Sequence, residues 1–210
     1  MAAIKKKQKT DGNTEQSIKA AAKVVFHKKG YAATRTRDIA EVAGMNLALL
    51  NYYFRSKEKL FQLIMVEAIS EFMQNLDGVF NDPKTTFERK LELVSENYID
   101  LFIKEPEMPL FIMSELRMHG AEILNKMPAA EKIMQSVFIK QYKVYVKKTK
   151  AADPDPVLFI MNLMALIVFP FIGSPILKRV GNISDKQFDL LMQKRKKLIP
   201  VWVKVMLNSH

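Results

Sequence analysis

The segment between residues 34 and 57 contains side chains that can bind nucleic acid. The side-chain amide of Asn51 can form two hydrogen bonds with one adenine. The hydroxyl groups of Tyr52 and Tyr53 can donate to phosphate oxygens while their rings pack against sugars. Lys57 adds a positive charge, and in the first turn of a helix it would act on a phosphate together with the free backbone N–H groups. These residue types could contact nucleic acid if the fold placed them on one surface.

The sequence contains none of the common motifs for catalysis. It has no Gly-rich phosphate loop, no H-E-x-x-H, no nucleophile elbow and no close acidic pair in a catalytic context. The absence of cysteine excludes disulfide scaffolds, thiol enzymes and cysteine-ligated metal sites. His27, His119 and His210 are too far apart in the sequence to suggest a metal cluster. We therefore expect no enzyme activity, no catalytic residues, no metal and no cofactor.

Positive charge is concentrated in the N-terminal part of the chain. The 210 residues carry a net charge of +11. Residues 1–62 hold 13 Lys and Arg against 5 Asp and Glu, whereas residues 63–210 hold 20 against 17. A polyanion would therefore bind the N-terminal part. Residues 1–12 lack the apolar stretch of a secretion signal, so we expect a basic flexible tail on a cytoplasmic protein.

Short helices are expected to position the DNA-binding segment. A first helix should start near Asn13 or Thr14 and stop at Gly30, and a second should cover residues 36–43. Gly44 suits the turn that follows, and Asn46 can cap a third helix at residues 47–53. Ser56 can cap a long fourth helix. This order of elements predicts a helix-turn-helix.

Helices of about seven residues do not persist alone, so the second and third must pack against the first and fourth. The apolar spacing assigns this role to the following residues: Phe26, Ile39, Ala40, Leu50, Phe54 and Leu60. The result would be a three-helix core with a helix-turn-helix inside it.

The rest of the chain also shows helical spacing and little strict alternation of apolar and polar residues. We expect an all-α protein with about nine helices, the later ones at residues 85–104, 107–119, 129–149, 155–178 and 185–207. The apolar run Val157–Gly173 is interrupted by Asn162 and Pro170 and is at the lower limit of a membrane span. We interpret it as a buried helix.

The stretch from Thr14 to Leu63 resembles the DNA-binding domain of the TetR/AcrR family of bacterial transcription regulators. The matching residues occur in the order and spacing of that family: Gly30-Tyr31 with Thr34, Asp38-Ile39-Ala40, Ala43-Gly44, Leu50, Tyr53-Phe54, and Ser56-Lys57-Glu58 with Leu60. The resemblance implies a DNA-binding domain at residues 13–62 and a helical ligand-binding and dimerisation domain at residues 63–210. It covers about a quarter of the chain, and the remainder carries no motif.

The resemblance also assigns DNA contacts. Positions that face bases or nearby backbone in the family are occupied here by Leu47, Ala48, Leu49 and Asn51. Positions that mainly touch phosphates are occupied by Thr34, Arg35, Thr36, Tyr52, Tyr53 and Lys57, and Asn46, the expected cap, completes the predicted set. The family more often has polar residues at the first three base-facing positions and tyrosine at the fourth. Base recognition is therefore expected to use apolar contacts with thymine methyl groups together with Asn51.

For the second domain the resemblance implies a two-fold homodimer formed by the last two helices. The expected interface residues are Phe188, Leu191, Ile199, Trp202 and Val203; the alternative is that these residues fill a monomer core. Eleven of the 13 Met and ten of the 13 Phe lie beyond residue 62, which suits a cavity for apolar ligands. The expected pocket residues are Tyr98, Phe102, Phe111, Met113, Met134, Phe138, Met161 and Met164; the alternative for each is core filling.

The resemblance thus implies a ligand-responsive transcription regulator. We expect a repressor that a mainly apolar small molecule releases from a pseudo-palindromic double-stranded DNA operator, with no membrane partner. The alternative is a helical adaptor or lipid-carrier protein with a vestigial helix-turn-helix, because the basic N-terminal part could also bind an anionic membrane surface.

Overall fold

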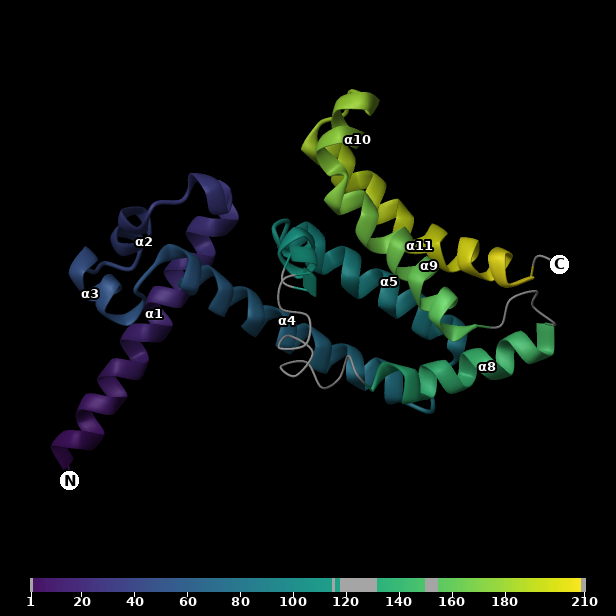
Figure 1. Ribbon diagram of the computed structural model, residues 1–210, viewed down its shortest axis with the longest axis horizontal. Coiled ribbons are helices and arrows are strands. Elements are labelled where there is room, and N and C mark those ends of the chain that lie inside the picture. The colour runs from purple at the N-terminus through teal and green to yellow at the C-terminus, as the bar shows by residue number, and fades with distance from the viewer. Residues whose placement is uncertain (1, 115, 118–131, 150–154, 209–210) are drawn as a thin grey trace. The chain divides into compact units, whose positions relative to one another are not determined.

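The computed structural model describes residues 2–114, 116–117, 132–149 and 155–208, with side chains from Asn13 onward except that of His27 (Figure 1). Within these ranges the chain is helical and contains no strand, which confirms the predicted all-α fold. It forms two compact units, Met1–Ile69 and Ser70–His210. The division lies inside helix α4 (Lys57–Asn81), a few residues beyond the predicted domain boundary.

The first unit contains α1 (Ala2–Ala33), α2 (Thr36–Val42), α3 (Leu47–Tyr53) and the start of α4. Helix α1 begins at Ala2 and so includes residues 2–12, where a basic flexible tail was expected; the flexibility of that segment stays a prediction. Ala, Lys and Gln dominate residues 2–9 and are strong helix formers, which lets the helix begin before the expected start near Asn13 or Thr14. Gly30 has a φ of 73° and interrupts the helix where a stop was predicted.

The core of the first unit is the predicted one. All six residues assigned to it are buried: Phe26, Ile39, Ala40, Leu50, Phe54 and Leu60. The ring of Phe26 packs edge-on against Phe61 with 5.0 Å between centroids, and Phe61 lies 4.6 Å from Tyr31. These contacts join α1 to α4 around the two short helices, which supplies the tertiary support that such helices require.

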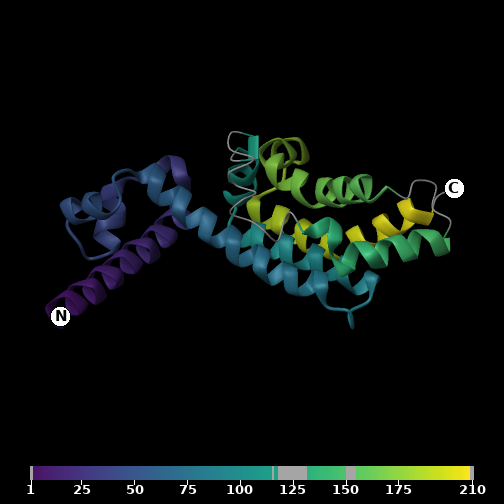
Figure 2. The same ribbon diagram turned by 60° about the horizontal axis from the view of Figure 1, so that its bottom comes forward.

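The second unit contains the rest of α4, then α5 (Phe87–Lys104), the short 3₁₀ turn η1 (Ile133–Gln135), α8 (Val137–Thr149), α9 (Pro156–Ile172), α10 (Ser174–Gly181) and α11 (Asp185–Asn208) (Figures 1 and 2). Residues 108–114 are also helical. Of the helix predicted at residues 107–119, the last part lies outside the described residues. The helix predicted from residue 129 begins at Val137 instead, because the Ser136 hydroxyl caps it by accepting from the Ile139 N–H at 3.3 Å.

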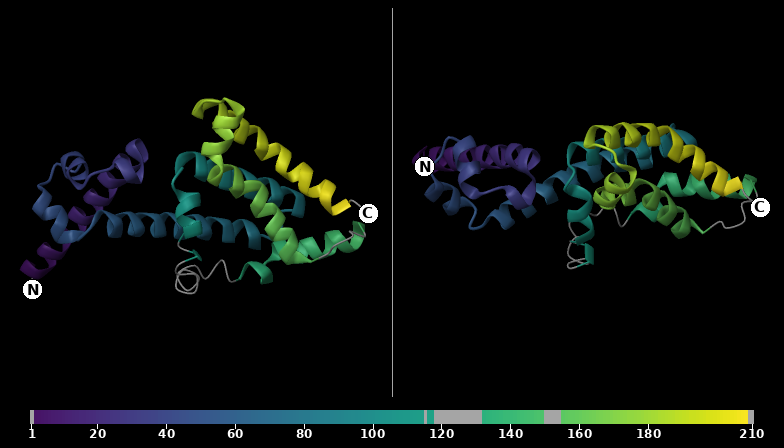
Figure 3. Two further views of the ribbon diagram at one scale, coloured as in Figure 1. Left: turned by 45° about the horizontal axis from the view of Figure 1, so that its top comes forward. Right: turned by 90° about the horizontal axis from the view of Figure 1, so that it is seen from above.

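The helix predicted at residues 155–178 is two helices, α9 and α10, which meet at a bend of 68° (Figure 3). Gly173 lies between them, and Pro170 weakens the end of α9. One side of α9 is buried, including Leu163 and Ile167, but Phe169 on the other side is 62% exposed. The expected buried helix is therefore buried on one face only. No single described helix is long and apolar enough to cross a membrane, although α9 and α10 together pass that test by length and composition.

A polar network inside the second unit joins the start of α5 to α8. Lys90 is fully buried, and its ammonium group donates to the Gln141 side chain at 2.9 Å. The Gln141 amide in turn donates to the Thr85 carbonyl at 2.9 Å. Burial lowers the pKa of Lys90. The network compensates a charge that would otherwise be buried without a partner.

Candidate nucleic-acid interface

Helix α3 presents one side to the core and the other to solvent. Leu50 is fully buried and anchors the helix, whereas Tyr52 is 80% exposed. Ala48 and Asn51 are also exposed. Asn51 lies three residues after Ala48, and Tyr52 lies four residues after it. This spacing places all three on one outward face. The structure therefore brings together part of the predicted base-facing set, next to exposed Leu47 at the start of the helix.

The turn before α3 fixes where this face points. Gly44 has a φ of 65°, a conformation that favours glycine, and no other atom approaches the position of a missing Cβ within 4 Å. Asn46 then caps α3, because its side-chain oxygen accepts from the Leu49 N–H at 2.7 Å. The cap was predicted from the sequence and is confirmed. Asn46 thus positions the start of the outward face.

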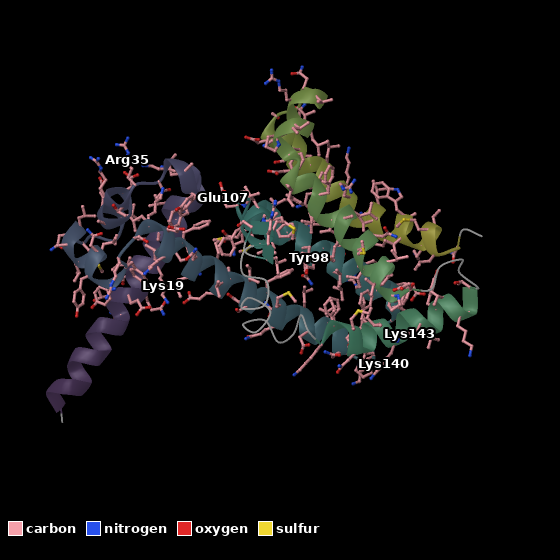
Figure 4. The ribbon with its side chains drawn as sticks, viewed as in Figure 1. Lys19, Arg35, Tyr98, Glu107, Lys140 and Lys143 are labelled. Atoms are coloured by element: carbon pink, nitrogen blue, oxygen red, sulfur yellow. The ribbon has the colours of Figure 1, made fainter. Side chains whose placement is uncertain are left out.

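The corner between α1 and α2 differs from the expectation for Thr34. This side chain is 2% exposed, and its hydroxyl donates to the Gly30 carbonyl at 2.7 Å. The Thr34 hydroxyl therefore has a structural role at this corner, and its predicted contact with phosphate stays a prediction. Arg35 is exposed at the start of α2 (Figure 4), and Thr36 is half-buried beside it.

Asp38 fixes the first turn of α2. Its carboxylate accepts from the Arg35 backbone N–H at 3.0 Å and forms an ion pair with Lys29 at 3.0 Å. The Lys29 ammonium group and the Arg35 N–H both lower the pKa of Asp38. The carboxylate near the N-terminus also suits the helix dipole. These contacts leave the Arg35 side chain free to point outward while its backbone is held.

Lys57 makes two contacts that sequence reasoning did not predict. Its ammonium group donates to the Tyr31 carbonyl at 2.9 Å and to the Thr34 carbonyl at 3.0 Å. The same group lies 4.3 Å from the centre of the Tyr31 ring. Two of its three N–H donors are thus used to hold the α1–α2 corner. Lys57 positions this corner, and at most one donor remains for a phosphate.

We therefore expect Lys57→Ala to lower the thermal stability of the protein as well as its affinity for every DNA sequence. Two hydrogen bonds from a charged group predict a loss of roughly 2–4 kcal/mol of unfolding free energy. Lys59→Ala is the matched control, because Lys59 is exposed and carries the same charge. Differential scanning fluorimetry should show a lower melting temperature for the first variant alone. Equal melting temperatures would show that the Lys57 contacts do not stabilise the corner.

Two basic residues that the prediction left out also lie at this surface. Arg55 and Lys59 are exposed, directly after the end of α3 and in the first turn of α4. Tyr53, which was included, is only half exposed, and Leu49 is 36% exposed. The signal that could have identified Arg55 and Lys59 is their position beside a predicted helix start, where phosphates bind.

Within the first unit, an ion pair fixes the point where α4 continues beyond the helix-turn-helix. Lys19 on α1 is 6% exposed, and its ammonium group lies 2.7 Å from Glu67 and 3.3 Å from Glu15. Burial would lower the pKa of Lys19, but the hydrogen bonds to the Glu67 and Glu15 carboxylates outweigh it and raise the pKa. A movement of Glu67 would therefore change its ion pair with Lys19 on α1.

Three of the predicted pocket residues, Tyr98, Phe102 and Phe138, take part in aromatic contacts of the second unit. Tyr98 packs on Phe72 at 4.6 Å and on Phe102 at 5.7 Å between ring centres. Burial raises the pKa of the Tyr98 hydroxyl to about 12, so it remains a neutral donor at physiological pH. Phe138 belongs to a separate aromatic cluster with Phe80, at 5.3 Å.

The predicted pocket residues differ in exposure, and their role in ligand binding stays a prediction. Met113, Met134 and Met161 are 40%, 38% and 59% exposed. Phe102 and Phe111 are buried, and Met164 is half-buried. Methionine content alone did not separate core from surface, because methionine suits both.

The predicted dimer residues also divide into two groups. Phe188, Ile199 and Val203 are buried within their own subunit, which matches the alternative of a monomer core. Leu191 is 43% exposed, and Trp202 is half-buried on the same outward side. Helix α11 has apolar residues on two faces, and the predicted set of interface residues combined both faces.

Comparisons with known proteins agree with this arrangement. The family model described as bacterial regulatory proteins, tetR family, matches residues 18–64. The probable HTH-type transcriptional regulator YttP of Bacillus subtilis is 24% identical over 165 residues, which is 76% of this chain and 78% of that protein. The HTH-type transcriptional repressor NicS of Pseudomonas putida is 31% identical over 108 residues, which is 51% of this chain and 50% of that protein.

A solved structure shares the fold over most of the chain. The transcriptional regulator FadR from Bacillus subtilis, in complex with stearoyl-CoA, superposes with a TM-score of 0.52 and 18% identity. The match covers 93% of this chain and 99% of that chain. At this identity the likeness concerns the fold alone.

Proposed function

We propose that this chain, whose residues 18–64 match the family model of bacterial regulatory proteins, tetR family, acts as a ligand-responsive transcriptional repressor. In this proposal a homodimer binds a pseudo-palindromic operator and leaves it when a mainly apolar small molecule binds the second unit. The two α3 helices would enter successive major grooves, about 34–36 Å apart or a multiple of one helical turn. The repressor name of the relative NicS supports the direction of control.

The outward face of α3 is the observation that carries the proposal. The helix is capped at Asn46 and anchored by buried Leu50, so exposed Ala48, Asn51 and Tyr52 are held in a fixed orientation. Exposed Arg35 and Arg55 supply positive charge at the ends of the same helix-turn-helix. Basic side chains around a helix with exposed amide and apolar groups suit phosphate contacts around a base-reading face.

An apolar effector is favoured by the aromatic residues of the second unit. Phe72, Tyr98 and Phe102 pack together, and Phe102 also contacts Phe171 at 5.2 Å between ring centres. Helix α4 contains Phe72 and also begins at Lys57, so one continuous helix belongs to both units. The FadR structure was solved with stearoyl-CoA, which is consistent with this fold accepting a ligand with a long apolar part. A ligand among these rings would act on DNA binding through α4.

The decisive experiment compares DNA with membranes. Random genomic fragments are passed over the pure protein, the retained DNA is sequenced, and affinity for the enriched site is measured at several salt concentrations. We expect one enriched palindromic sequence, with affinity that falls steeply with salt. Binding to vesicles of anionic phospholipid without any enriched DNA sequence would support the adaptor or lipid-carrier alternative instead.

Asn51→Ala tests whether the outward face reads bases. We expect it to cost about 1–3 kcal/mol on the enriched site, to change affinity for random DNA little, and to relax the preference at one position in each half-site. The reason is that the Asn51 amide is exposed on α3 and takes no part in holding the helix. Fluorescence anisotropy with both DNAs measures the difference.

Asn46→Ala is the matched control for this measurement. It removes the same amide but also the cap of α3, so it should weaken binding to both DNAs and lower the melting temperature. If Asn51→Ala weakened both DNAs equally without a change in melting temperature, Asn51 would be a backbone contact and not a base contact.

A further inference from the structure

Pro170 leaves one backbone carbonyl of α9 without its helical partner. In an α-helix each carbonyl accepts from the N–H four residues later, and proline has no N–H. The carbonyl of Leu166 therefore has no intrahelical donor. Arg195 on α11 supplies one, because its guanidinium Nη2 donates to the Leu166 oxygen at 2.6 Å. A side chain of one helix thus repairs the hydrogen-bond defect of the other.

This hydrogen bond holds a positive charge that no carboxylate balances. The guanidinium carbon lies 5.0 Å from the centre of the Trp202 ring, and the side chain is half-buried. Among the described residues, no Asp or Glu forms an ion pair with Arg195. Burial lowers its pKa, but a guanidinium remains charged. Arg195 therefore presents unused N–H donors at the edge of the α9–α11 pair.

Both helices of this pair carry an outward row of residues with the spacing of a helical interface. Steps of four, three, four and three residues, which keep side chains on one face of a helix, define each row. We call these rows the α9 stripe and the α11 stripe. They consist of Leu158, Asn162, Ala165, Phe169 and Ile172, and of Leu191, Arg195, Leu198, Trp202 and Val205.

Each stripe contains one polar residue, Asn162 in the first and Arg195 in the second. Lys186, Lys197 and Lys204 lie on the opposite side of α11 by helical position, away from its stripe. The α11 stripe itself contains no lysine, although exposed Lys194, one residue before Arg195, lies beside it. The α9 stripe and the α11 stripe have the same length and the same spacing of residues. Together they can pack against the same two stripes of a second subunit.

We infer that Asn162 and Arg195 determine which pairing of two copies is allowed, a step that rests on the proposed homodimer. In the correct register their remaining donors and acceptors meet polar groups of the second copy. In a shifted register, or in a larger assembly, the amide and the guanidinium are buried against apolar side chains without partners. Single polar residues in apolar interfaces of this kind fix register and stoichiometry at some cost in affinity. The fixed position of Arg195 makes it suited to this role, because the Leu166 carbonyl prevents it from turning away.

The test separates this role from the repair of α9. Asn162→Leu makes the α9 stripe fully apolar and removes no helix hydrogen bond that the structure describes. For Arg195 the comparison is between Pro170→Ala and the double variant Pro170→Ala with Arg195→Leu. Replacing the proline restores the backbone N–H that the Leu166 carbonyl lacks, so Arg195 is no longer needed there. Lys197→Leu is the control, because it also replaces a cation with leucine, but on the side of α11 away from the stripe.

Sedimentation velocity over a range of concentrations gives the readout. We expect the wild type, Pro170→Ala and Lys197→Leu to form dimers only. Asn162→Leu and the double variant should associate at about tenfold lower concentration, since a buried leucine replaces a polar group, and should also form species larger than dimers. The melting temperature of the double variant should match that of Pro170→Ala.

Two other outcomes would each contradict one part of the proposal: the role of Asn162 and Arg195 in pairing, or the homodimer itself. If the wild type dimerises and both variants keep its stoichiometry and concentration dependence, Asn162 and Arg195 do not govern pairing, and Arg195 serves the Leu166 carbonyl alone. If the wild type stays monomeric throughout, the homodimer itself fails, and with it the proposed mode of operator binding.

Discussion

Trp202→Glu is expected to convert the dimer into monomers and to reduce operator affinity by at least about a thousandfold, toward non-specific binding. Trp202 lies in the α11 stripe, and Arg195 packs on its ring. In a symmetric dimer the change replaces two rings with two carboxylates in an apolar interface, and an ion pair with the adjacent Arg195 would offset only part of the desolvation cost of several kcal/mol each. A single helix-turn-helix contacts too few base pairs to retain the specific affinity of two. One substitution far from the DNA should therefore abolish specific binding.

Sedimentation velocity and fluorescence anisotropy on the same samples check this result. Lys197→Glu is the control, since it changes charge on the other side of α11 and should leave the dimer intact. The melting temperature of the monomer shows whether the subunit remains folded without the tryptophan ring. A Trp202→Glu protein that still dimerises at the wild-type concentration would place the interface elsewhere.

The helix-turn-helix could be predicted from the sequence because local signals determine it. Gly44 is needed for the positive φ of the turn, and Asn46 is needed to cap the Leu49 N–H three residues later. Both depend only on neighbouring residues, and the structure confirms both. The core around Leu50 follows from the spacing of apolar residues, which requires only the period of a helix. The exposed position of Asn51 follows from the same period.

The features that could not be predicted depend on contacts between distant residues. Lys57 was assigned to phosphate from its place in a helix, but the carbonyls that take two of its donors belong to residues 23 and 26 positions earlier. Ile199 was assigned to the dimer because a helix with two apolar faces does not reveal which face meets its own core. The role of Arg195 requires knowing that α11 passes beside the carbonyl that Pro170 leaves free. No local pattern contains that information.

A mainly apolar small molecule that binds the second unit is expected to weaken operator binding by about 5- to 150-fold, which corresponds to a coupling of roughly 1–3 kcal/mol. A ligand can change DNA affinity only through its different affinities for the two arrangements of the protein. Helix α4 offers the connection. It carries Phe72 beside Tyr98 in the second unit, and Glu67 on the same helix pairs with Lys19 in the first. A shift of α4 would therefore move α1 and change the spacing of the two α3 helices.

Thermal shift against a set of fatty acids, acyl esters and other apolar compounds identifies a binder, which is then titrated into the complex of protein and operator. Tyr98→Phe tests the site, because it removes only the hydroxyl and keeps the ring against Phe72 and Phe102. It should lower the affinity for a ligand that carries an oxygen acceptor by about fivefold, which corresponds to one hydrogen bond, and leave the operator affinity of the free protein unchanged.

Lys19→Met should keep ligand binding but reduce the release from DNA, since the ion pair to Glu67 is lost. A ligand that stabilises the protein and leaves operator affinity within twofold would show that α4 does not transmit binding, and the second unit would then serve dimerisation alone.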